Sequence, residues 1–274
     1  MRLLTWIRHR WDGLQALLQF DNWPFLVIER CSRQTLLVYR KGDVRFLVDR
    51  AGGDQYDLIQ CVARDMYSRH FPYLTKKHPL RVLDLGANSG GFGLALILGG
   101  FEIERIVAVE MNLRTHARLA FNLANNIGSK ASLVHAAVCE TNRRVRVADN
   151  NGWVGNSIYH QHLTDTPSIE VPGITLDELT SIYFPNGRVN ILKMDIEFAE
   201  YEVLLSETCK SIVQYDLLLI EIHTDEQHET KTLVRRLDEL NFEILAGNRG
   251  DGVYLFRNRT CRTNSESIKD SARV

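Results

Sequence analysis

The segment from Val82 to Leu96 constrains the fold of this chain more than any other. A short apolar run reaches Asp84, glycines stand at positions 86 and 90, and apolar residues then recur at helical spacing. Glycine lets a backbone turn sharply and approach a ligand without a Cβ clash. Asn88, between the two glycines, tolerates the left-handed region, and its amide can bond a ligand. The pattern predicts a buried strand, a ligand-binding loop and a helix.

Beyond residue 80 the chain alternates between predicted strands and helices. Such alternation indicates βαβ units and a mostly parallel sheet. We therefore expect an α/β, Rossmann-like fold with seven strands, and short strands in an insertion over residues 143–171. The expected strands are 81–85, 105–110, 131–138, 189–194, 216–222, 242–246 and 252–257, and the expected helices 91–98, 113–126, 175–183, 199–208 and 226–240.

The chain divides into three parts on sequence grounds. With 274 residues, 45% of them hydrophobic, it can bury one α/β core with an appendage. We predict an N-terminal cap over residues 1–78, formed by an amphipathic helix, a hairpin turning at Gly42 and a helix after Gly53. Residues 79–257 form the main domain, and residues 258–274 a polar tail.

Charge and cysteine content exclude several classes of protein. Lys and Arg number 33 against 34 Asp and Glu, which gives no basic excess for nucleic-acid binding. The five cysteines show no CxxC spacing, so no zinc site or disulfide framework is indicated, and we expect a cytoplasmic protein. Residues 1–20 show helical spacing broken by arginines, with neither a membrane span nor a signal peptide. They either pack on the cap or contact a membrane surface.

A second acid sharpens the ligand prediction. Glu110 ends the strand after the glycine loop, where a carboxylate accepts hydrogen bonds from ribose hydroxyls. Dinucleotide enzymes use the same acid, but this loop lacks the G-x-G-x-x-G spacing. Asp84 either faces a positively charged ligand group or caps the loop amides.

Taken in order, these segments resemble the FkbM family of S-adenosylmethionine-dependent methyltransferases. The likeness spans roughly residues 36–257 and rests on the order and spacing of several motifs rather than on any one. The motifs are Asp84–Phe92, Ala108–Asn112, Val134–Val138, Thr175–Asp177, Leu192–Glu197 with Glu200, and Glu221–His223.

The resemblance implies a class I methyltransferase fold and S-adenosylmethionine as the cofactor. It further implies O-methylation, with a hydroxyl of a sugar, glycan or glycosylated metabolite as the acceptor. Small side chains in the third strand would leave room for the adenine. The expected cofactor-binding residues are Asp84, Gly86, Ala87, Asn88, Gly90, Glu110, Asn112, Ala136 and Ala137.

Two positions depart from the family pattern. The family has glycine after the second acid of the Leu192–Glu197 motif, where this chain has Phe198. It has proline after the strand-end acid, where this chain has Met111. The bulky ring of Phe198 puts the acceptor pocket and the activity in question.

The chemistry requires an aligned acceptor and the removal of a hydroxyl proton. Asp195 and Glu197 follow the fourth predicted strand, and His223 ends its neighbour, so all three should face the glycine loop. We expect Asp195 at the reaction centre and His223, by its ordinary pKa, as the general base. The same three side chains could instead hold Mg²⁺. In the insertion, Trp153, Tyr159, His160 and His162 are a candidate acceptor lid.

Two other readings stay open. One is a nicotinamide-dependent oxidoreductase, which the absent G-x-G-x-x-G disfavours. The other is a catalytically inert module that binds cofactor without turnover, which the ring of Phe198 makes conceivable.

Overall fold

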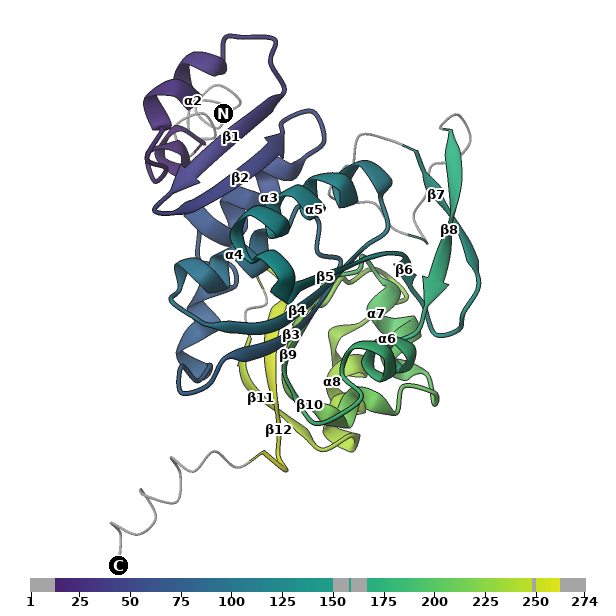
Figure 1. The fold of residues 1–274 in the computed structure, drawn as a ribbon. Coiled ribbons are helices and arrows are strands. Elements are labelled where there is room, and N and C mark those ends of the chain that lie inside the picture. The colour runs from purple at the N-terminus through teal and green to yellow at the C-terminus, as the bar shows by residue number, and fades with distance from the viewer. Residues whose placement is uncertain (1–12, 150–157, 159–166, 248–249, 262–274) are drawn as a thin grey trace, which may run out of the picture.

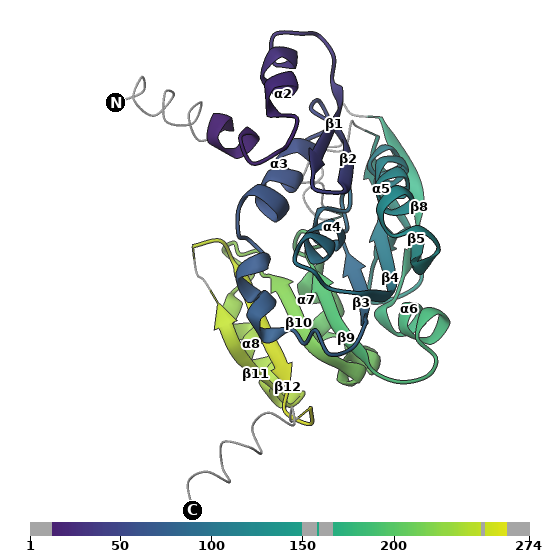
Figure 2. The ribbon, with the colours of Figure 1, turned by 60° about the vertical axis from the view of Figure 1, so that its left-hand side comes forward.

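A computed structural model describes residues 13–149, 158, 167–247 and 250–261 of the chain. A seven-stranded sheet lies at the centre, helices cover both of its faces, and the N-terminal cap lies beyond one helical layer (Figures 1 and 2). The predicted Rossmann-like α/β class is confirmed.

The central sheet has the strand order β11-β12-β10-β9-β3-β4-β5. All neighbours run parallel except β12, which is antiparallel to both β10 and β11. The strands are β3 (Leu80–Leu85), β4 (Ile103–Glu110), β5 (Ala131–His135), β9 (Val189–Met194), β10 (Tyr215–Glu221), β11 (Phe242–Gly247) and β12 (Val253–Asn258). The chain moves outward from β3 to β5, then returns to β9 and moves the other way, so the order reverses between β3 and β9.

Each face of the sheet has its own apolar core. Alternate residues of the central strands point to opposite faces, so Val82 packs with one helical layer and Leu83 with the other. The first layer holds α4 (Gly91–Leu98) and α5 (Leu113–Asn126). The second holds α6 (Leu176–Tyr183), α7 (Ala199–Leu205) and α8 (Thr230–Glu239).

The third predicted strand is the main error in the sequence-based assignment. Residues 131–138 form two strands rather than one, because the chain leaves the central sheet after His135. The short β6 (Ala137–Val138) pairs instead with β8 (Ser168–Ile174), which also pairs with β7 (Arg144–Ala148). The predicted short strands of the insertion are thus present, and they draw Ala137 out of the main sheet.

Three predicted helices are shorter in the structure by at least three residues. The helix after Gly53 is α3 (Asp54–Leu58), which widens into a π-helical turn at Ile59–Ala63, and a separate 3₁₀ turn follows at Ser68–Tyr73. The helix α7 ends at Leu205, three residues early. The helix α8 begins at Thr230, because the Asp225 side chain first holds the amides of Gln227 and His228 in a turn.

The cap contains a hairpin and a short helix. Strands β1 (Leu36–Lys41) and β2 (Val44–Asp49) pair antiparallel, and Gly42 at their turn has a φ of +56°, as predicted. The helix α2 (Trp23–Glu29) precedes them. Residues 13–17 are helical, and Leu17 and Phe20 are buried in the cap core. This part of the predicted amphipathic helix packs on its own domain, and residues 1–12 lie outside the described chain.

The helix α5 joins the cap to the sheet. The side chain of Asn122 donates to the carbonyl of Leu47 and accepts from its amide, as a neighbouring strand would. Asn126 makes the same pair of bonds to Arg45. Arg118 donates to the fully buried carboxylate of Asp54 over 2.9 Å. The cap therefore shares polar contacts and one apolar core with the main domain.

None of the helices formed by the described residues combines the length and the apolar character needed to cross a membrane.

Candidate active site

The pocket lies where the strand order reverses. Open α/β sheets bind ligands at such points, beyond the carboxyl ends of the strands. Gly86 follows β3 and Asp195 follows β9, and the amide of Asp195 donates to the carbonyl of Leu85 over 3.1 Å. Gly86 has a φ of +68°, and an added Cβ would overlap the carbonyl oxygen of Asp195. Glycine is thus required here by both conformation and space.

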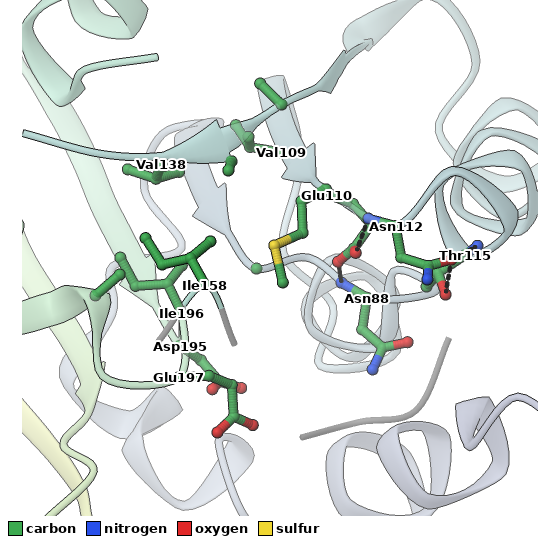
Figure 3. A pocket seen from close by; sticks show the side chains of 15 residues that line it. Asn88, Val109, Glu110, Asn112, Thr115, Val138, Ile158, Asp195, Ile196 and Glu197 are labelled. Carbon is green, nitrogen blue, oxygen red and sulfur yellow. Dashed lines mark hydrogen bonds between the residues drawn. The ribbon is translucent and has the colours of Figure 1, made fainter. Parts of the chain in front are cut away.

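One half of the pocket is built around Glu110. Its carboxylate accepts from the amide of Asn88 over 3.1 Å and from the amide of Asn112 over 2.7 Å (Figure 3). Burial raises the pKa of Glu110 to about 7, although these two amides oppose the rise. Asn88 has the expected positive φ, and its buried Oδ1 has no partner among the described residues. The Oδ1 atom of Asn112 is engaged elsewhere, because it caps the N-terminus of α5.

The other walls of this half are apolar. Ala136 and Ala137 line the pocket together with Val109, Val138 and Ile158 (Figure 3). Small and branched side chains of this kind leave a slot for a flat ring. The slot, the orphaned Asn88 oxygen and the carboxylate of Glu110 fit the adenosine part of S-adenosylmethionine.

Most of the predicted site residues reach the pocket, but four do not. The pocket lining includes Gly86, Asn88, Glu110, Asn112, Ala136, Ala137, Asp195 and Glu197. Ala87 and Gly90 belong to the turn behind it, and His223 lies beyond Glu197. The fourth, Asp84, is 1% exposed and pairs with Lys193 across 3.4 Å beneath the loop.

Lys193 supports the floor of the pocket. Its ammonium donates to the carbonyl of Gly86 over 2.7 Å and lies 3.6 Å from Asp195. Burial lowers its pKa, but the carboxylates of Asp84, Asp195 and Asp57 raise it overall. Lys193 therefore stays charged and holds the glycine loop against β9.

At the other end of the pocket, Asp195 and Glu197 belong to a cluster of charged side chains around His223, which lies just beyond the lining. Its Nε2 lies 3.3 Å from Glu197, and 3.9 Å from both Asp195 and Glu221. Its Nδ1 lies 3.1 Å from Oε1 of the fully buried Glu200. A carboxylate can only accept, so Nδ1 donates this bond and Nε2 faces the other three acids.

These groups shift one another's protonation. Burial, followed by the charge of Asp195, raises the pKa of Glu197 to about 7 and that of Glu221 to about 9. Burial lowers the pKa of His223, but the bond to Glu200 and the nearby carboxylates outweigh it and raise the pKa to about 10. At neutral pH His223 therefore carries a proton. An imidazolium cannot accept another, so the ordinary histidine pKa on which we based its assignment as general base does not hold here.

The two departures from the family pattern occupy different places. Met111 lines the pocket, and its carbonyl bonds His135 over 2.9 Å. Phe198 is not among the lining residues; its ring packs between His223 and His228, with centroid distances of 5.5 Å to each. Its φ of +75° explains why glycine suits this position.

Three side chains that contact the site residues were not predicted as part of the site. The Tyr67 hydroxyl lies 3.2 Å from Asp195 and 3.4 Å from Glu221 and can donate its one proton to either, and Glu200 orients His223. Glu221 could have been found from spacing, because it precedes His223 by two residues, as Asp195 precedes Glu197, and alternate residues share a face. Tyr67 belongs to the cap. It lies within the segment that resembles the family, but no pattern around it predicts a contact with Asp195.

The candidate acceptor lid, with Trp153, Tyr159, His160 and His162, lies outside the described residues.

Comparison with known proteins agrees with this geometry. Residues 84–244, more than half of the chain, match the family model of the methyltransferase FkbM domain. None of the curated proteins matches the chain.

Several solved structures are similar at low identity. Methyltransferase FkbM from Methylobacillus flagellatus is 15% identical, with a TM-score of 0.45, over 74% of this chain and 53% of that one. Trm5 from Methanocaldococcus jannaschii, in complex with adenosine, is 12% identical, with a TM-score of 0.44, over 82% and 55%. Magnesium protoporphyrin IX methyltransferase from Synechocystis, with bound SAM, is 10% identical, with a TM-score of 0.41, over 74% and 81%.

Likenesses this distant do not carry those proteins' activities to this chain, which spans about half the length of the first and second. The assignment rests on the matched residues themselves. The matched residues begin at Asp84 below the glycine loop, include Glu110 and the Asp195 cluster, and end in β11. The chain belongs to the FkbM methyltransferase domain family.

Proposed function

We propose that this chain transfers the methyl group of S-adenosylmethionine to a hydroxyl oxygen of a sugar, glycan or glycosylated metabolite. The observation that supports the proposal is that one pocket has two chemically different sides. Glu110, backed by two amides, stands on one side of it, and the Asp195 and Glu197 carboxylates stand on the other. A ribose-binding acid and a proton-handling cluster thus face the same space.

The chain's own residues would bind the cofactor, align the acceptor hydroxyl and remove its proton. The cofactor, when bound, supplies a methyl group already activated by the positive charge on its sulfur. Glu110 would accept from the ribose hydroxyls, and the slot at Ala136 and Ala137 would receive the adenine. Asp195 is fixed by Tyr67 and Lys193, which suits a residue that positions the acceptor for in-line attack.

The acceptor hydroxyl must also lose its proton. Glu197, with a pKa of about 7, is better matched to accept it at neutral pH than the protonated His223. His223 would then stabilise the carboxylate beside it. That the acceptor oxygen belongs to a sugar follows from the family resemblance alone.

The other two readings fit the site less well. A nicotinamide enzyme would need a different phosphate loop, since this one has no G-x-G-x-x-G. An inert module was conceivable because of Phe198, but that ring packs against His223 and His228 rather than lining the pocket.

Two measurements test the proposal. In calorimetry with adenosylhomocysteine, the wild type should bind and Glu110→Gln should bind about 10- to 100-fold more weakly, the cost of disturbing hydrogen bonds to a charged group. A folded wild-type chain that ignored adenosylhomocysteine but bound NAD would overturn the assignment.

The second measurement follows labelled methyl transfer onto glycan and glycolipid fractions. Wild type and Asp43→Ala, a change in the exposed turn between β1 and β2 at a residue that does not line the pocket, should label the same product, and Asp195→Ala should not. Equal labelling by Asp195→Ala would remove Asp195 from the mechanism.

A further inference from the structure

The charged half of the pocket has the form of a metal-binding site. We propose that Asp195, Glu197 and His223 bind one divalent cation, with Glu221 beside it as a fourth ligand or a ligand to its water. The inference rests on the proposed function only for what the cation would do there; its binding stands on the geometry below.

The spacing of the ligand atoms fits a common ion. One donor atom from each of Asp195, Glu197 and His223 lies within 4.8 Å of the other two. Two atoms that each lie about 2.1 Å from one ion are roughly 3.0 Å apart at a right angle and 4.2 Å apart when opposite. The observed separations from His223 Nε2 are 3.3 Å to Glu197 and 3.9 Å to Asp195.

The side chains behind the ligands fix their orientation. Metal-binding histidines almost always donate their second ring N–H to a carboxylate or carbonyl, and this histidine donates Nδ1 to Glu200. Glu200 is fully buried, and its other oxygen has no hydrogen-bond partner among the described residues. Tyr67 likewise holds the outer oxygens of Asp195 and Glu221. A chance group of surface acids would lack this supporting shell.

Acidic groups outnumber basic groups around His223. Asp195, Glu197, Glu200 and Glu221 all lie within 3.9 Å of its ring nitrogens. Among the basic side chains that the structure describes, Lys193 lies close to Asp195, and it is shared with Asp84 and the carbonyl of Gly86. Four carboxyl groups converge on one imidazole, and a divalent cation in place of the Nε2 proton would bring more positive charge to them. One nitrogen with carboxylate oxygens suits Mn²⁺, Fe²⁺ or Zn²⁺ and accepts Mg²⁺ less well.

Such a cation would make the acceptor hydroxyl more acidic. In the proposed transfer the O–H proton would pass to a carboxylate of the cluster, the new O–C bond would form as the C–S bond breaks, and the sulfonium would leave as a neutral thioether. Asp195 would then act as a ligand that places the hydroxyl, and Glu197, the proton acceptor proposed above, would take the proton on the oxygen that does not bind the ion.

The test is metal binding by the full chain, without any methyl acceptor. Chain stripped with EDTA and dialysed is titrated with Mn²⁺, and free Mn²⁺ is followed by electron paramagnetic resonance, with Zn²⁺ calorimetry as a second probe. We expect one ion per chain. Asp195→Asn, Glu197→Gln and His223→Gln should each weaken binding at least tenfold, and Glu200→Gln about 10- to 100-fold, since it acts only through His223.

His228→Gln is the matched control. His228 packs on the same Phe198 ring and bonds a carboxylate, Asp225, over 2.8 Å, but it is not part of the ligand group. It should bind the ion as the wild type does. Circular dichroism of each variant separates loss of a ligand from loss of the fold.

The result that overturns the proposal is a folded wild-type chain that binds neither Mn²⁺ nor Zn²⁺ at one per chain, or a folded His223→Gln that binds like wild type. Adenosylhomocysteine calorimetry on the same metal-free chain keeps the two proposals apart. If that ligand binds and no metal does, the metal site is wrong and the methyltransferase proposal stands.

Discussion

The two halves of the pocket are formed by different kinds of chemical groups. Around Glu110 the contacts are backbone amides from the ends of β3 and β4, and one carboxylate. Around His223 the contacts are side chains from β9, α7, β10 and the cap. The first half depends on the path of the chain, so its shape follows from the fold. The second depends on several ionisable groups whose charges set one another.

This contrast predicts which substitutions should change the fold and which should change the protonation of side chains. Changes at the loop should alter the backbone and thereby both halves. Changes near His223 should alter proton binding while leaving the loop intact.

The largest effect is expected where the halves touch. Gly86→Ala should destabilise the chain by several kcal/mol and abolish adenosylhomocysteine binding, because a Cβ there meets the Asp195 backbone as well as suffering a positive φ. Gly128→Ala is the matched control: it has the same φ of +68° with open space around it, and should cost only about 1–2 kcal/mol. Urea denaturation measures both. Equal losses would mean that the close contact with β9 contributes nothing.

The next effect concerns pH and separates the charged half from the Glu110 half. Folding raises the pKa of His223 from 6.5 to about 10 and that of Glu221 from 4.5 to about 9. Between pH 7 and pH 9 the folded chain keeps protons that the unfolded chain has released, so unfolding releases protons and is favoured as pH rises. The metal-free protein should lose about 2–3 kcal/mol over this range, since one proton corresponds to about 1.4 kcal/mol per pH unit and the cluster shares its protons.

Urea denaturation at pH 7, 8 and 9, in EDTA, measures that slope. Glu221→Gln should flatten it, because it removes one of the two groups. Glu110→Gln should change it much less, because Glu110, with a pKa of about 7, is already half titrated at pH 7 and has lost nearly all of its proton by pH 8. A slope of zero in the wild type would show that the charged half is not coupled as described.

The smallest effect isolates backbone conformation within the charged half. At Phe198, φ is +75°, where a Cβ costs about 1–2 kcal/mol. Both Phe198→Gly and Phe198→Ala remove the ring, but only glycine removes the Cβ. Phe198→Gly should therefore be more stable than Phe198→Ala by about 1 kcal/mol in thermal or urea denaturation. If alanine were the more stable, the left-handed conformation would not be present in solution.

The same contrast explains what the sequence could predict. Helix bounds 91–98 and 113–126 and strand bounds 189–194 were correct, because glycine turns, the Asn112 cap and continuous apolar runs are local signals. Strand 131–138 was split, because Ala137 and Val138 pair with β8, some 35 residues away. Nor could local patterns place Tyr67 beside Asp195, since 128 residues separate them.

The protonation of His223 was missed for the same reason. An ordinary pKa describes an isolated imidazole, whereas four carboxylates surround this one. Their positions depend on how the strands come together where the strand order reverses, and no single segment of the sequence specifies that arrangement.

The helix α5 has a consequence for how the protein can be shortened. It starts at the pocket, where Asn112 caps it, and within its 14 residues it also presents Arg118, Asn122 and Asn126 to the cap. A chain cut before residue 79 would leave the Arg118 guanidinium without its buried counter-ion, and the Asn122 and Asn126 side-chain amides without their partners on β2. All three residues lie on α5, the helix that begins at the pocket. We therefore expect the smallest stable unit to begin upstream of the hairpin, although the matched family segment starts at residue 84.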